Sequence, residues 1–167
     1  MILACAALSV AGTLVLSSCT TGGPTSVATV SSAPPAPPAP PASLDRLDEA
    51  RRDWERAGMQ DYTFVVDSGC GERNLIGRFA VTVRDGVVSA VTGEIAGEAI
   101  TPDEYLDEGG ETIDGFLDRV STASPEDVVA LELDDALGYP TVIGFDPEPR
   151  GIDDEECYEI GDVEVTP

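Results

Sequence analysis

Every charged side chain of this 167-residue chain lies beyond residue 44, and a proline-rich segment marks the boundary. Residues 33–42 read Ala-Pro-Pro-Ala-Pro-Pro-Ala-Pro-Pro-Ala, and residues 20–32 hold mainly Ser, Thr, Gly and Val. Neither segment has the apolar side chains needed for a core, and the prolines favour an extended polyproline II conformation of about 3.1 Å per residue. We therefore expect one folded domain, over residues 44–167, which is long enough for a single hydrophobic core.

The N-terminal 18 residues are apolar and uncharged, as in a signal peptide. They end in Leu16-Ser17-Ser18, and Cys19 follows. These four residues have the pattern of a lipobox, the motif in which the cysteine thiol accepts a diacylglyceryl group. We expect a signal peptide over 1–18, a lipidated Cys19 and a linker over 19–43. The alternative is an uncleaved membrane anchor with an incidental cysteine, although the run is short for a full span. No Lys or Arg precedes the run, so we expect the true translation start to lie upstream.

A lipid on Cys19 would hold the domain at the extracytoplasmic face of the cell membrane, where the compartment is oxidising. Of the four cysteines, Cys5 leaves with the signal peptide, so the mature domain keeps Cys70 and Cys157. An isolated pair in such a compartment is expected to form a disulfide, and the alternative is two buried free thiols. Closing a loop of this size stabilises the fold by about 4 kcal/mol.

The domain carries 9 basic and 32 acidic residues, and all the basic ones are arginine. The net charge of −23 argues against nucleic acid and an anionic membrane surface as partners, because both would repel it. The membrane contact that we expect is the lipid anchor alone. The acidity has two interpretations, which are solubility outside the cell and attraction of a cation or a basic protein partner.

Hydrophobic periodicity predicts two helices, each followed by three strands. The first helix spans residues 43–57, with Ser43 as its N-cap and Trp54 on its apolar face. The second begins after Thr112, and residues 93–110 between the two halves are acidic and predicted to be a loop. The expected strands are residues 62–66, 76–83, 87–91, 128–133, 141–145 and 157–165.

Asp85-Gly86 between the second and third strands is a strong signal for a tight hairpin turn. A second turn, over residues 134–140, contains Gly138, which can adopt a positive φ. Strands joined by tight turns pair antiparallel. The order helix–three strands–helix–three strands therefore predicts an α+β fold, an antiparallel sheet with two helices on one face.

Several short segments together resemble a known family. They are Asp61-Tyr62-Thr63-Phe64, Val83-Arg84-Asp85-Gly86, Thr112-Ile113-Asp114-Gly115-Phe116 and Leu137-Gly138-Tyr139-Pro140-Thr141. Over nearly all of residues 44–167, the chain is similar to the bacterial exported-protein family known as domain of unknown function 6174. The resemblance implies an exported or lipid-anchored protein, and it implies no activity, substrate or catalytic residue.

The missing residue types exclude much familiar chemistry. The chain has no histidine, which excludes Ser-His-Asp and Cys-His catalysis and histidine-based metal sites. It has no lysine, which excludes a Schiff base and a phosphate-loop lysine. Carboxylates remain, and they crowd the segment that contains Asp146, Asp153, Asp154 and Glu155.

Three functions are compatible with these carboxylates. The first is a binding or interaction module without chemistry of its own. The second is a calcium site built from Asp146, Asp153, Asp154 and Glu155, since calcium takes six to eight oxygen ligands. The third is a hydrolase that pairs Asp134 or Asp135 with Asp153 or Glu155 as acid and base. We expect no cofactor apart from calcium in the second case.

Overall fold

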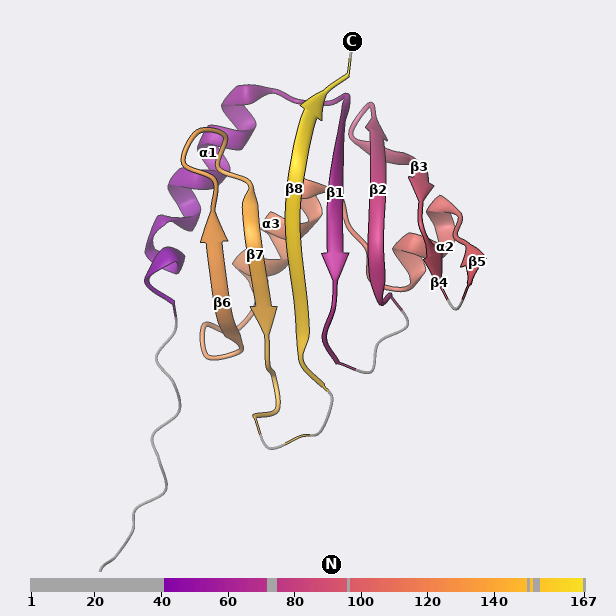
Figure 1. The fold of residues 1–167 in the computed structure, drawn as a ribbon. Coiled ribbons are helices and arrows are strands. Elements are labelled where there is room, and N and C mark those ends of the chain that lie inside the picture. The colour runs from indigo at the N-terminus through magenta and orange to yellow at the C-terminus, as the bar shows by residue number, and fades with distance from the viewer. Residues whose placement is uncertain (1–40, 72–74, 96, 150, 152–153, 167) are drawn as a thin grey trace, which may run out of the picture. The chain divides into compact units, whose positions relative to one another are not determined.

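The computed structural model describes residues 41–71, 75–95, 97–149, 151 and 154–166. As predicted, the fold is α+β, with helices packed on one face of a six-stranded antiparallel sheet (Figure 1). In chain order the elements are η1 (Ala42–Arg46), α1 (Leu47–Ala57), β1 (Tyr62–Ser68), β2 (Gly77–Arg84), β3 (Val87–Thr92), β4 (Glu94–Ile95), β5 (Glu98–Ala99), α2 (Pro102–Asp107), α3 (Ile113–Thr122), β6 (Val128–Leu133), β7 (Pro140–Phe145) and β8 (Glu156–Val165).

The first and last strands are neighbours at the centre of the sheet. The strand order is β3-β2-β1-β8-β7-β6, and every pair is antiparallel. β1 and β8 pair from Tyr62 opposite Val165 to Ser68 opposite Tyr158. The meander β1–β3 and the meander β6–β8 therefore become one sheet through this single pairing (Figure 1).

Side chains alternate between a covered and an uncovered face of the sheet. In β1, Tyr62, Phe64 and Val66 are buried, whereas Thr63 and Val65 between them are only half-buried. The buried set packs against the helices, where the Trp54 ring of α1 meets the Tyr62 ring edge-on at 5.3 Å. In the described residues, the opposite face has no second layer over it (Figure 1).

Two of the predicted local sequence signals, a hairpin turn and a helix N-cap, are present in the structure. Asp85 and Gly86 both have positive φ values, 49° and 75°, as the two central residues of a tight hairpin turn require. The Thr112 hydroxyl accepts a hydrogen bond from the Gly115 amide and caps α3. The first amide of α3, that of Ile113, donates to the buried hydroxyl of Tyr62 at 3.2 Å. Burial raises the pKa of Tyr62 to about 12, so the hydroxyl stays protonated.

The segment predicted to be a loop, residues 93–110, is partly regular. It forms the short β4–β5 hairpin and a third helix, α2, in addition to the two helices expected. Thr101 and Glu104 form a reciprocal capping box at the start of α2, with Pro102 in its first turn. The spacing Thr-x-x-Glu is the sequence signal for such a capped helix. The surrounding acidic and glycine residues are more typical of a loop, and the helix is too short to show a clear hydrophobic period.

Ser43 does not cap the first helix, contrary to prediction. The helical region opens with the 3-10 turn η1, which follows Pro41. The Ser43 hydroxyl instead donates a hydrogen bond to the Leu131 carbonyl oxygen. This bond fixes η1 against β6, which is an edge strand of the sheet. A backbone group at that edge is thereby covered.

Gly138 provides a test of how the β6–β7 turn packs on α1. Its φ is 78°, and an added Cβ would overlap the Ala50 carbonyl oxygen. We expect Gly138→Ala to lower the free energy of unfolding by about 3 kcal/mol, from the backbone conformation and the overlap together. Gly58→Ala is the matched control, since its φ is 63° with no atom near, and it should cost about 1 kcal/mol. Equal losses in urea denaturation would contradict the packing described.

Candidate functional site

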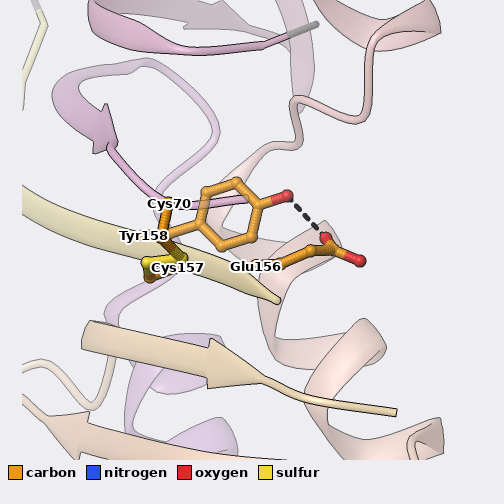
Figure 2. The surroundings of a disulfide bond; sticks show 4 residues. All are labelled: Cys70, Glu156, Cys157 and Tyr158. Atoms are coloured by element: carbon orange, nitrogen blue, oxygen red, sulfur yellow. Dashed lines mark hydrogen bonds between the residues drawn. A yellow bond between two sulfur atoms is a disulfide. The ribbon is translucent and has the colours of Figure 1, made fainter. Parts of the chain in front are cut away.

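The predicted disulfide is present and joins the two halves of the sheet. Cys70 lies just beyond the end of β1, and Cys157 lies in β8, 87 positions further along the chain. Their Cα atoms are 5.5 Å apart, within the usual range for a disulfide. Figure 2 shows that Glu156 and Tyr158, the neighbours of Cys157, turn toward one another and away from this bond.

A charged group is buried beside the disulfide. Glu156 is only 5% exposed, and its carboxylate accepts hydrogen bonds from the Tyr158 hydroxyl, at 2.8 Å, and from the Arg119 guanidinium. Arg119 also donates to the Tyr158 hydroxyl at 3.0 Å. Two strand residues from β8 and one helix residue from α3 thus form a closed triangle of polar contacts.

Aromatic rings surround the arginine of this triangle. The guanidinium carbon of Arg119 lies 4.9 Å from the centre of the Phe145 ring and 5.6 Å from that of Tyr158. Burial raises the pKa of Tyr158, an effect that Arg119 opposes and the Glu156 carboxylate adds to. Because the charges neutralise one another inside a packed environment, this arrangement can hold α3 against β8.

Sequence reasoning missed this triangle, although a signal for it exists. Glu156, Tyr158 and Ile160 alternate in one phase, so the charge of Glu156 falls on the buried face of its strand. Arg119 lies in α3 close to three buried residues of the same helix, Phe116, Leu117 and Val120. A lone acid on a buried strand face and a lone base on a buried helix face are the signature of a buried ion pair.

The acidic residues predicted to bind calcium do not form a cluster in the described structure. Asp146 follows β7, Glu155 is exposed just before β8, and Asp153 lies outside the described residues. No group of three or more acidic or cysteine side chains within the described segments could hold a metal ion. The calcium site stays a prediction.

Asp153 lies outside the described residues, and the other carboxylates considered for hydrolysis lie at opposite ends of β7. The Asp134 carboxylate accepts hydrogen bonds from the amides of Ala136 and Leu137, and Asp135 pairs with Arg46 at 2.9 Å. Glu155 lies at the other end, because the following residue, Glu156, pairs with Phe145. A six-residue strand separates these ends by about 20 Å, whereas a catalytic pair requires about 5 to 9.5 Å.

Acidic groups line several hollows on the described surface, and two of the larger hollows carry three carboxylates each. One, of about 280 Å³, lies between the β4–β5 hairpin and α2 and is lined by Glu98, Glu104 and Glu108 with Ile95 and Ile100. The Glu104 carboxylate there already caps α2. The other, of about 260 Å³, lies on the uncovered face of the sheet, over β1, β2, β7 and β8. We take this uncovered face as the candidate functional surface.

The fold and surface described so far define a small α+β domain with one bare sheet face. Residues 46–165 match the model of a family described as a family of unknown function (DUF6174). The match spans most of the chain, which therefore belongs to this family, as the sequence motifs indicated. No curated protein and no solved structure matches the chain. No helix in the described segments is long and apolar enough to cross a membrane.

The disulfide gives a prediction about stability. We expect the double variant Cys70→Ala, Cys157→Ala to lose about 4 kcal/mol of unfolding free energy, because the unfolded chain is no longer constrained. Urea denaturation measures the loss. Wild-type protein treated with a reductant is the control and should match the variant. If the reduced protein unfolds at the midpoint of the oxidised one, the bond contributes nothing to the fold.

Glu111 gives a prediction about pH. Burial raises the pKa of this carboxyl, Asp118 adds to the effect, and Arg119 opposes it. A raised folded-state pKa means that stability is present below the unfolded value of about 4.3 and is lost as the pH rises through the folded value. We expect Glu111→Gln to raise the melting temperature at pH 7 and to leave it unchanged near pH 3.5.

The matched control for Glu111→Gln is Glu126→Gln, at an exposed position before β6. This substitution should change stability by less than about 0.5 kcal/mol at either pH, as most surface substitutions do. A Glu111→Gln variant that is less stable than wild type at pH 7 would show that the ionised carboxylate supports the fold.

Proposed function

We propose that this protein is a lipid-anchored interaction module at the extracytoplasmic face of the cell membrane, without catalytic activity of its own. The observation that carries the interaction role is the bare, hollowed face of the central sheet. An antiparallel sheet can leave one face to solvent, but a hollow on that face in which aliphatic and charged side chains lie together offers a surface for a partner.

The anchor rests on the lipobox and on the composition of the linker. Cys19 is the residue that would carry the lipid, and residues 20–43 would separate it from the domain. The Cys70–Cys157 disulfide supports an extracytoplasmic location, because structural disulfides form and persist in oxidising compartments.

The partner that we propose is a basic protein. A net charge of −23 repels nucleic acid and anionic lipid headgroups, and it attracts positively charged surfaces. The carboxylates at the two ends of β7 cap a turn, pair with an arginine or lie in solvent, which favours binding over hydrolysis.

The anchor is tested by Cys19→Ala. We expect this variant to lose metabolic labelling with a fatty acid and to leave the membrane fraction, because no acyl chain then holds it. Cys5→Ala is the matched control and should keep both the label and the membrane association. A Cys19→Ala protein that still carries the fatty acid would overturn the lipoprotein assignment.

A further inference from the structure

The uncovered sheet face carries a row of charges across four strands. The strand registers place Arg78 of β2 opposite Asp67 of β1, Asp67 opposite Glu159 of β8, and Glu159 opposite Val142 of β7. Arg78 lies 3.7 Å from the Asp67 carboxylate. Glu159 forms no ion pair with any other described residue, although it faces Asp67 directly. Like charges in directly opposite positions destabilise a sheet.

A bulge adds another carboxylate to the same face. The pairing of β1 with β8 shifts register between Thr63 and Val65, and Asp162 in the shifted part of β8 has a φ of 52°. A bulge of this kind redirects a side chain. It brings the Asp162 carboxylate to 3.4 Å from Arg78, on the uncovered face. Both the opposed acids and the left-handed aspartate are unfavourable for folding alone.

Apolar groups lie among these carboxylates. The hollow of about 260 Å³ is lined by Val65, Val142 and Gly161 as well as by the charged residues of the row. Both valines are half-buried, so their methyl groups remain accessible. The hollow therefore offers an aliphatic floor with Glu159 and Asp162 at its sides.

We propose that a basic protein segment binds in this hollow, with Lys or Arg side chains on Glu159 and Asp162 and an aliphatic side chain on Val65 and Val142. This proposal rests on the proposed interaction function and assigns its surface. The negative charge of this face matches a basic partner. It disfavours a second copy of the chain as occupant, since two strongly acidic faces repel one another. Arg78 pairs with both Asp67 and Asp162 and so fixes the positions of these carboxylates on the uncovered face.

The test uses the full chain in detergent micelles and a fluorescent peptide of alternating Lys and Val residues as the probe. The double variant Glu159→Gln, Asp162→Asn removes two charges from the hollow. The control variant Asp48→Asn, Glu49→Gln also removes two negative charges, but from exposed positions of α1, in the helix layer behind the sheet. Unfolding midpoints at or above that of wild type for the sheet-face variant confirm that it folds.

We expect the sheet-face variant to bind the peptide about three- to thirtyfold more weakly than wild type, which is the effect of losing two exposed ion pairs. The α1 variant should stay within about twofold of wild type. Equal weakening in both variants would show attraction to the overall charge alone and would overturn the proposal. The absence of peptide binding to wild type would overturn it as well.

Crosslinking in cells separates this proposal from the proposed function. A photo-reactive residue at the exposed position Ala80, on the uncovered face of β2, is compared with one at Glu49 on α1. The proposed binding surface is supported if adducts form from position 80 alone and contain a lysine- or arginine-rich peptide. These adducts should also be lost in the variant Glu159→Gln, Asp162→Asn. Adducts from Glu49 alone leave the interaction function standing and overturn the surface. Adducts from neither position overturn both.

Discussion

The pairing of β1 with β8 is the interaction on which the rest of the structure depends. It is the contact that turns two separate meanders into one sheet, and it joins strands from opposite ends of the domain. The register also sorts the side chains of β8, with Tyr158 toward the helices and Glu159 toward the uncovered face. A shift of one residue would exchange these two faces, placing a carboxylate in the core and a tyrosine in solvent.

Two devices fix this register, and both lie at the start of β8. The disulfide ties Cys157 to the end of β1, and the flanking residues Glu156 and Tyr158 engage Arg119 from α3. A slipped strand would separate Glu156 from Arg119, and a buried carboxylate parted from its cation is costly by several kcal/mol. The ion pair therefore penalises the wrong register more than it stabilises the right one.

The sequence predicted the elements whose signals are local. Asp85-Gly86 determines its hairpin through positive φ values, and Thr112 determines the start of α3 through its hydroxyl. The triangle around Arg119 and the charge row around Glu159 depend on which strands are neighbours, and periodicity carries no information about the pairing of β1 with β8. The cysteine pair was the one long-range signal, because chemistry restricted Cys70 to a single partner.

The position of a carboxylate matters more for binding than the number of carboxylates. Several arginines of the helices are engaged within the domain, as in the contacts of Arg51 with Asp118 and Arg56 with Asp53, and the excess of acidic residues surrounds the fold with a general negative field. At physiological salt such a field decays over about 8 Å and selects only for sign. On the sheet face, strands hold Glu159 and Asp162 beside an aliphatic floor. Selectivity among basic partners can arise there because the backbone fixes both the charges and the apolar contact between them.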